Sequence, residues 1–329
     1  MTKRLYETAH TLIYDPVVAN GNSTRSSLHS LGFRNVELAP AFDILENRLR
    51  ARSPDLVLCE ASGAEAELCR LIQRVRQGLL GHNPFILLVV TTWRRDGTII
   101  SQVLNSGADD LVARPISTTM LGERIKVLTE RRKRFAVTYD YIGPDRRRDP
   151  DRPGAECIDV PNSLQMRNLD LHAHEDGERH IVDAILEGKK RLNVVKIQRD
   201  TVQLCMQWGL AESRGPQTRE FADILVRMER NAEGIKRRAP EADYEEAVEW
   251  CESIIESVRR ISAQTRSGEG AEGQAAEVIS PETIGPQLRL IGHATMALQR
   301  MLAPGETALP RLVDVEGRIF PSGRQTAAA

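Results

Sequence analysis

Short apolar runs alternate with amphipathic stretches in the N-terminal part of the chain. The runs predict five strands, at residues 11–14, 35–38, 55–59, 85–90 and 111–113. Apolar residues spaced three or four positions apart predict five helices that follow these strands, at about 18–31, 42–52, 64–76, 98–104 and 120–130. An unbroken apolar run such as 85–90 is typical of a strand that is covered on both faces.

Strands that alternate with helices in this way predict a parallel sheet with helices on both faces. Because crossovers between parallel strands are right-handed, few topologies remain, and we expect a flavodoxin-like, doubly wound α/β fold. Binding sites in such sheets lie beyond the carboxyl ends of the strands. The polar residues at those ends are Asp15, Glu60, Thr91 and Arg114.

The pattern changes after residue 135. The next stretch is polar and rich in Pro, Asp and Arg, with Gly143-Pro144-Asp145-Arg146-Arg147-Arg148 in its middle, so we expect little regular structure there. Beyond it, helical spacing predicts helices at 179–188, 192–210, from about 216, at 244–262 and at 283–302, with a linker at 267–276. We therefore predict an α/β domain at 8–135, a linker at 136–176, a mostly α-helical region at 177–303 and a flexible tail at 304–329.

Composition narrows the class of protein. Hydrophobic residues make up 41% and charged residues 28%, an ordinary balance for a soluble protein. The net charge of -1 gives no general reason for binding nucleic acid or an anionic membrane. No apolar run approaches the roughly 20 residues of a membrane helix, and no signal peptide is visible. The five cysteines are scattered without metal-binding spacing, so we expect a cytoplasmic protein.

Four segments resemble the receiver domain of response regulators, and together they span about residues 10–135. Residues 12–15 (LIYD) resemble the first strand of the family, which ends in an acidic pair. Residues 53–60 (SPDLVLCE) resemble the third strand, which ends in the phosphoacceptor Asp, and residues 89–92 (VVTT) resemble the fourth. Residues 107–115 (GADDLVARP) resemble the family's Gly-Ala-Asp-Asp-Tyr-Leu-x-Lys-Pro run and are the most specific of the four.

The resemblance implies transfer of a phosphoryl group from a kinase histidine to an Asp that holds a divalent metal. This sequence departs from that pattern at the acceptor, where Glu60 stands. Its extra methylene moves the carboxylate by about 1 Å, a displacement that can cost on the order of 100-fold in rate. Three further positions differ and two match: Pro16 replaces the second acid, Arg114 the Lys and Leu111 the switch aromatic, whereas Asp15 and Thr91 fit.

We interpret this pattern as a pseudo-receiver, in which Arg114 pairs with Glu60 through a bidentate contact and locks the domain in one state. One alternative is a receiver that still binds Mg²⁺ weakly through Asp15 and Glu60. Another is that Glu60 and Arg114 are solvated residues at strand ends. The pseudo-receiver and the solvated-residue interpretations both predict loss of the usual phosphorylation chemistry, and apart from the weakly bound Mg²⁺ of the other alternative no cofactor is expected.

Other candidate sites lie outside this edge. The basic runs 131–134 and 146–148 are either solvated or contacts for nucleic acid or an acidic partner. His172, His174 and His180 form a loose cluster without a known metal-binding spacing. His293 lies on a predicted helix, where a histidine phosphotransfer protein would carry its reactive residue. Such proteins usually have a Lys-Gly context after that histidine, and the neighbours Ala294 and Thr295 here favour a plain helix histidine.

No Walker-type, Gly-x-Ser-x-Gly or His-Glu-x-x-His motif occurs, so we expect no enzymatic activity. The resemblance implies bacterial two-component or phosphorelay signalling by protein contact. Its expected partners are a histidine kinase or another regulator, and a homodimer through the helical region is a further expectation. The alternatives are a DNA-binding transcriptional regulator and a phosphotransfer protein that uses His293.

Overall fold

The computed structural model describes residues 6–147, 156–169, 174–267 and 281–302. The chain forms two compact units, residues 1–189 and 190–329, and each is described by itself. The predicted tail at 304–329 and most of the predicted linker at 267–276 lie outside the described residues. Within the described ranges, no helix combines the length and the apolar composition needed to cross a membrane.

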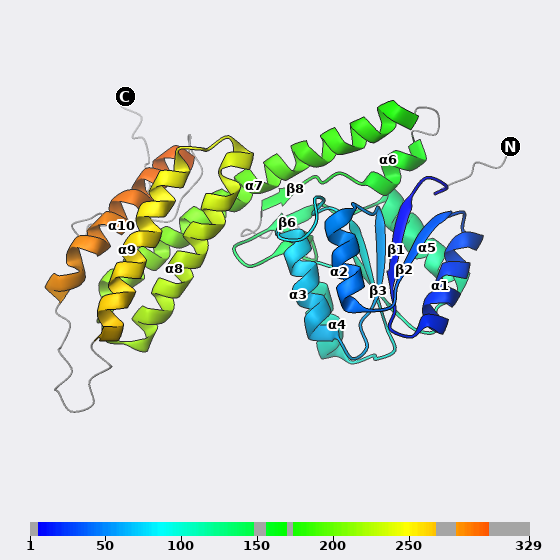
Figure 1. The fold of residues 1–329 in the computed structure, drawn as a ribbon, viewed down its shortest axis with the longest axis horizontal. Coiled ribbons are helices and arrows are strands. Elements are labelled where there is room, and N and C mark those ends of the chain that lie inside the picture. Colours follow the sequence, from blue (N-terminus) through cyan, green and yellow to red (C-terminus); the bar gives the residue numbers. More distant parts are fainter. Residues whose placement is uncertain (1–5, 148–155, 170–173, 268–280, 303–329) are drawn as a thin grey trace, which may run out of the picture. The chain divides into compact units, whose positions relative to one another are not determined.

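A five-stranded parallel sheet forms the centre of the first unit (Figure 1). Its order is β2-β1-β3-β4-β5, the flavodoxin-like order that the sequence predicts. The strands are β1 (His10–Tyr14), β2 (Asn35–Ala39), β3 (Leu56–Glu60), β4 (Leu87–Thr92) and β5 (Asp110–Ala113). The helices between and after them are α1 (Val18–Ser30), α2 (Phe42–Ala51), α3 (Glu65–Arg76), α4 (Gly97–Asn105) and α5 (Thr118–Glu130). The predicted receiver-like fold is thus confirmed.

Both faces of this sheet are buried, which explains the unbroken apolar runs in its central strands. Alternate residues of β3 and β4 enter two separate apolar clusters, because successive side chains of a strand point to opposite faces. Val57 and Leu88 join the cluster that α2, α3 and α4 cover. Leu58 and Val89 join the one that α1 and α5 cover.

Residues 135–169 contain regular structure, so the expectation of an irregular linker is wrong there. Three short strands form an antiparallel sheet in the order β7-β6-β8. They are β6 (Phe135–Val137), β7 (Ile142–Pro144) and β8 (Glu156–Ile158), and α6 (Ser163–Leu169) follows. The polar composition of this segment is misleading, because several of its charged side chains form hydrogen bonds or ion pairs within the first unit.

Asp109 is the centre of a buried charge cluster that holds the small sheet in place. Its Oδ2 accepts hydrogen bonds from Arg76 Nη2 (2.7 Å) and from the Leu88 amide (2.8 Å). Arg132 Nε donates to Oδ1 at 3.0 Å. Both guanidinium groups lie 5.0 Å from the ring centroid of Phe135, the first residue of β6. Burial lowers the pKa of Arg76 to about 10, which leaves it charged at neutral pH.

The Gly-Pro-Asp-Arg-Arg segment docks the β6–β7 hairpin onto the loop before β5. A Cβ added to Gly143 would lie 2.7 Å from the Cα of Gly107, so the two backbones touch only because both residues are glycine. Arg146 donates to the Ala108 carbonyl. Asp145 and Arg147 form a bidentate pair at 3.0 and 2.9 Å. These contacts give the motif a structural role.

The helices after this region are α7 (His174–Ser213), α8 (Arg219–Arg238), the short η1 (Pro240–Ala242), α9 (Ala247–Ser267) and α10 (Pro281–Leu302). The sequence predicts separate helices at 179–188 and 192–210, but the structure has the single helix α7. Gly188 does not end it, because its role is close packing. A Cβ there would lie 2.8 Å from Pro161 Cδ and 2.9 Å from Phe85 Cε2.

Helices α8, α9 and α10 and the second part of α7 share one apolar core in the second unit. Trp208 on α7 is 1% exposed and donates its indole N–H to the Leu288 carbonyl at 3.1 Å. Gly292 on α10 lies against this indole, since an added Cβ would be 2.6 Å from Trp208 Cζ2. The predicted mostly helical region is therefore confirmed as a fold class.

Gly292→Ala is expected to lower the stability of the second unit by about 1–3 kcal/mol, because the new methyl group overlaps the Trp208 ring. Gly209→Ala is the matched control, since a Cβ at this helical position meets nothing within 4 Å. Alanine there should stabilise by up to about 1 kcal/mol through helix propensity. Urea unfolding followed by circular dichroism measures both changes. Equal effects of the two variants would contradict this packing.

Candidate functional site at the carboxyl edge of the sheet

The structure brings together the four polar residues that end the strands. Asp15 follows β1 directly, Glu60 is the last residue of β3, and Thr91 lies in β4. The strand register places Glu60 opposite Thr91. Arg114 follows β5, and its side chain reaches back across the edge of the sheet. Parallel strands place their carboxyl ends at one edge, which is why separate segments of the sequence meet here.

Arg114 joins two carboxylates in this site. Its Nε donates to Glu60 Oε2 at 2.6 Å, and its Nη2 donates to Asp15 Oδ2 at 2.9 Å. The expected contact was bidentate on Glu60 alone; instead, the two sides of the guanidinium bind two different carboxylates. The fork geometry of arginine, with five N–H donors in one plane, permits this bridge, whereas a lysine ammonium presents a single point of charge.

The oxygens of Glu60 accept further hydrogen bonds from neighbouring residues. The Thr91 hydroxyl donates to Oε2 at 2.7 Å. Ser62 donates to Oε1 from both its backbone N–H (3.0 Å) and its hydroxyl (2.6 Å). Each carboxylate oxygen of Glu60 therefore has at least two donors, which leaves little lone-pair capacity for another group.

All four residues are buried, with exposed fractions of 0% for Asp15, 4% for Glu60, 1% for Thr91 and 9% for Arg114. The alternative in which Glu60 and Arg114 are solvated at strand ends is therefore wrong. Ion pairs in such surroundings persist only with good geometry and satisfied hydrogen bonds. Here the contacts among these side chains supply both.

Two carboxylates and one guanidinium give the site a formal charge of about -1. Burial raises the pKa of Asp15, and the nearby Glu60 carboxylate acts in the same direction. The hydrogen bond from the Val17 amide to Asp15 Oδ1 (2.9 Å) and the charge of Arg114 act against this shift. The site thus resists further negative charge on electrostatic grounds.

Three residues complete the site that the sequence analysis did not identify. Thr24 on α1 accepts a weak hydrogen bond from Arg114 Nη2 at 3.4 Å. Ser62, described above, also accepts from the Trp93 amide at 3.2 Å. The Trp93 ring, 51% exposed, has its centroid 5.9 Å from the guanidinium carbon of Arg114. Only Ser62 had a sequence signal, its position two residues after Glu60.

The predicted switch position, Leu111 in β5, is half-buried and packs against the apolar cluster beneath α2, α3 and α4. A leucine here has no ring to turn between an inward and an outward position, and it has no polar group to expose. Its role in signalling stays a prediction. The packing agrees with a side chain that serves the core.

The residues at this edge do not fit a magnesium site. Mg²⁺ requires oxygen ligands in octahedral geometry at about 2.0–2.1 Å. Both carboxylates, Asp15 and Glu60, are instead bound by the guanidinium of Arg114, and Pro16 offers no side-chain oxygen. In the part of the chain that the structure describes, no three His, Cys, Asp or Glu side chains converge in a metal-binding group.

The other candidate residues from the sequence do not come together in one site. His172 lies outside the described residues, as does the side chain of His174, and His180 is exposed. His293 is exposed on α10. In the basic run 131–134, the Arg132 side chain is buried against Asp109 and Arg134 donates to the Cys157 carbonyl at 2.8 Å, whereas Arg131 and Lys133 are exposed.

Fold and site together define a receiver-like α/β domain whose carboxyl-edge residues are paired with one another. No family model matches the sequence, and no curated protein matches it. The chain is similar in structure to an orphan response regulator of H. pylori, at 20% identity and a TM-score of 0.32, over 37% of this chain and 96% of that one.

Two further solved structures are each similar over 36% of the chain. One is a response regulator from Thermotoga maritima, 26% identical, with 36% of this chain and 95% of that chain covered and a TM-score of 0.32. The other is RcsB from Salmonella enterica serovar Typhimurium, bound to the promoter rprA in the presence of phosphomimetic BeF3-. It is 20% identical over 36% of this chain and 67% of that one, with a TM-score of 0.32.

Proposed function

We propose that residues 8–135 act as a pseudo-receiver: a receiver-like domain that takes no phosphoryl group and transmits a signal by protein contact. We place it in bacterial two-component or phosphorelay signalling, in the cytoplasm. The single observation that supports this function best is the position of the Arg114 guanidinium. It binds Glu60 and Asp15 together, in the space where a receiver of the usual kind holds its metal and phosphate.

Electrostatics supports the loss of phosphorylation. An acyl phosphate on Glu60 would carry about -1.5 to -2 charges in place of the single carboxylate charge, and so would make a site with a formal charge of about -1 more negative still. Without a divalent metal, only one guanidinium would offset that charge, and it is already engaged by two carboxylates. The acceptor oxygens of Glu60 are also occupied by hydrogen-bond donors, so they are poorly placed for in-line attack.

The proposed mode of action is docking. A site closed by internal ion pairs holds one arrangement of the edge, and a partner such as a histidine kinase or another regulator would bind that fixed surface. The helical region 177–303 would then serve as the effector or dimerisation part. DNA binding and phosphotransfer through His293 remain the alternatives, and no contact among the described residues favours either.

The test is exposure of the full chain to acetyl phosphate and Mg²⁺, followed by intact-mass and peptide-mass measurement. We expect no phosphoryl adduct, while a phosphorylatable receiver in the same buffer gains one. Glu60→Asp alone should also stay unmodified, because Pro16 and Arg114 remain. An acyl phosphate on Glu60 would refute the proposal.

A matched experiment tests the phosphotransfer alternative. The chain and its His293→Gln variant are incubated with a phosphorylated histidine kinase, and acid-labile phosphate is measured on each. The pseudo-receiver proposal expects none on either protein. Label on the parent chain that disappears in His293→Gln would instead support phosphotransfer.

A further inference from the structure

One nitrogen of the carboxyl-edge site is left without a protein partner. Arg114 Nε donates to Glu60 and Thr91, and Nη2 donates to Asp15 and Thr24. Nη1 donates to no atom of the described residues, although the side chain is only 9% exposed. Nη1 is also not among the atoms that the fold seals from solvent. The two N–H groups on this nitrogen of a nearly buried guanidinium are therefore open to an acceptor from outside.

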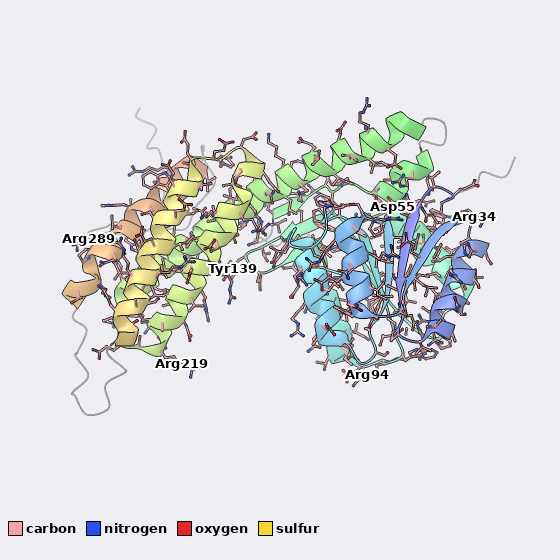
Figure 2. All side chains as sticks on the ribbon, in the orientation of Figure 1. Arg34, Asp55, Arg94, Tyr139, Arg219 and Arg289 are labelled. Carbon is pink, nitrogen blue, oxygen red and sulfur yellow. The ribbon has the colours of Figure 1, made fainter. Side chains whose placement is uncertain are left out.

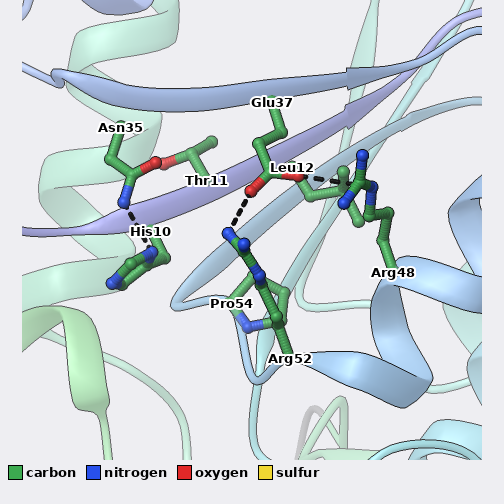
Figure 3. Close-up of a pocket in the computed structure, with 8 residues that line it drawn as sticks. All are labelled: His10, Thr11, Leu12, Asn35, Glu37, Arg48, Arg52 and Pro54. Carbon is green, nitrogen blue, oxygen red and sulfur yellow. Dashed lines mark hydrogen bonds and ion pairs between the residues drawn. The ribbon is translucent and has the colours of Figure 1, made fainter.

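Two arginines at the other end of the sheet show how this differs from ordinary solvent exposure. Arg48 and Arg52 line a hollow at the amino-terminal ends of β1 and β2, and both pair with Glu37 (Figure 3). Both side chains are exposed, so bulk water satisfies their remaining N–H groups. Arg114 instead belongs to a nearly closed site, where Nη1 reaches only a small area of solvent. An acceptor from a partner can replace the water there without loss of a hydrogen bond.

Exposed apolar side chains lie around this donor. The Trp93 ring is 51% exposed, and its centroid lies 5.9 Å from the guanidinium carbon of Arg114. Val17 is exposed to the same extent, and its backbone N–H donates to Asp15, the carboxylate that Arg114 binds. Val18, the first residue of α1, is exposed as well. Single exposed apolar residues need no explanation, but a group of them beside an open donor is typical of an interaction surface.

Charge indicates which kind of acceptor fits. The closed site carries a formal charge of about -1, so an anionic group of a partner is repelled. Arg94 does not change this balance, because it pairs with Glu65 at the same end of the sheet (Figure 2). The next two residues, Arg95 and Asp96, carry opposite charges. A neutral oxygen, such as that of a backbone carbonyl or a side-chain amide, accepts from a guanidinium without this repulsion.

We propose that Val17, Val18 and Trp93 form a docking rim for a partner protein segment that presents a neutral oxygen acceptor between apolar side chains. The acceptor takes a hydrogen bond from Arg114 Nη1, and the apolar side chains of the segment cover the Trp93 ring and the two valines. Hydrogen bonds from a charged donor are stronger than neutral ones, so this contact fixes the position of the segment on the rim. The inference rests on the proposed function, since it names the chemistry of the partner that the closed site receives.

The probe is N-acetyl-L-phenylalaninamide, a neutral molecule with two amide carbonyls and an aromatic ring, titrated into the isotope-labelled full chain and followed by NMR. We expect saturable shifts of the Arg114 side-chain N–H resonances and of the Val17 and Trp93 amides, with a dissociation constant on the order of 1 mM. Trp93→Ala should weaken binding about fivefold or more, because the ring contact is lost. Trp250→Ala removes an exposed tryptophan of the second unit and is the matched control, which should leave binding unchanged.

N-acetyl-L-phenylalanine, which has a carboxylate in place of the terminal amide, tests the charge. We expect it to bind about threefold or more weakly, because the closed site repels it. The proposal fails if the amide gives no saturable shift at Arg114, if Trp250→Ala weakens binding as much as Trp93→Ala, or if the carboxylate binds as tightly as the amide. None of these measurements involves a phosphodonor, so the proposed function is refuted separately, by an acyl phosphate on Glu60.

Discussion

Replacing Arg114 by alanine is expected to lower the free energy of unfolding of the first unit by about 3–5 kcal/mol near neutral pH, because it leaves buried carboxylates without their partner. Asp15 and Glu60 would face each other with exposed fractions of 0% and 4% and no cation between them.

The loss should depend on pH. Burial raises the pKa of Asp15 in the folded protein, and removal of the guanidinium raises it further. A carboxyl group with a raised folded-state pKa stabilises the fold below its unfolded-state pKa and loses that contribution as pH rises through the folded value. The penalty for Arg114→Ala should therefore shrink as pH falls from 7 toward about 4.

Hydrogen exchange of the β3 and β4 amides in the full chain measures this stability without contributions from the second unit. Arg94→Ala is the control, because its side chain is 57% exposed and its pair with Glu65 is on the surface. It should change stability by no more than about 0.5–1 kcal/mol. If Arg114→Ala costs no more than this control at pH 7, the buried ion pairs do not stabilise the edge.

Phe135→Ala is expected to cost about 3–5 kcal/mol and to release the β6–β7–β8 sheet. Phe135 is 0% exposed, and both Arg76 and Arg132 stack on its ring. Removing the ring opens a cavity and admits water beside the charge cluster at Asp109. Phe135→Leu keeps most of the volume and should cost about 1–1.5 kcal/mol.

Hydrogen exchange of the β6 and β5 amides distinguishes the release of the small sheet from the disturbance of the charge cluster at Asp109. We expect the β6 amides to lose protection first in Phe135→Ala, since they belong to the smaller sheet, and β5 to follow through Asp109. Unchanged protection of β6 would contradict the view that residues 135–169 are part of the first folding unit. It would instead favour a boundary at residue 135.

The parallel sheet was predictable because its signal is local. The run at 85–90 and its neighbours alternate with amphipathic helices, and parallel strands have few permitted topologies. The meeting of Asp15, Glu60, Thr91 and Arg114 followed from the same rule, since strand ends share an edge. Their functional role stays a prediction.

The small sheet, the continuous helix α7 and the additional site residues depended on long-range contacts that composition does not reveal. The segment after residue 135 looked unstructured because it is polar, but Arg146 binds the Ala108 carbonyl, 38 positions earlier in the chain. Gly188 resembled a helix end, although its function is to let α7 approach Pro161. Trp93 and Thr24 joined the site through loop and helix geometry for which the sequence carries no sign.

The two charged sites at opposite ends of β4 have a consequence for strand alignment. An apolar strand buried on both faces could slide by one residue along its neighbours without exposing a polar side chain, so hydrophobic burial alone specifies its alignment weakly. Here such a slide would part Thr91 from Glu60 at one end and the Leu88 amide from Asp109 at the other. These two hydrogen bonds to buried carboxylates thus hold β4 in a single alignment with its neighbours.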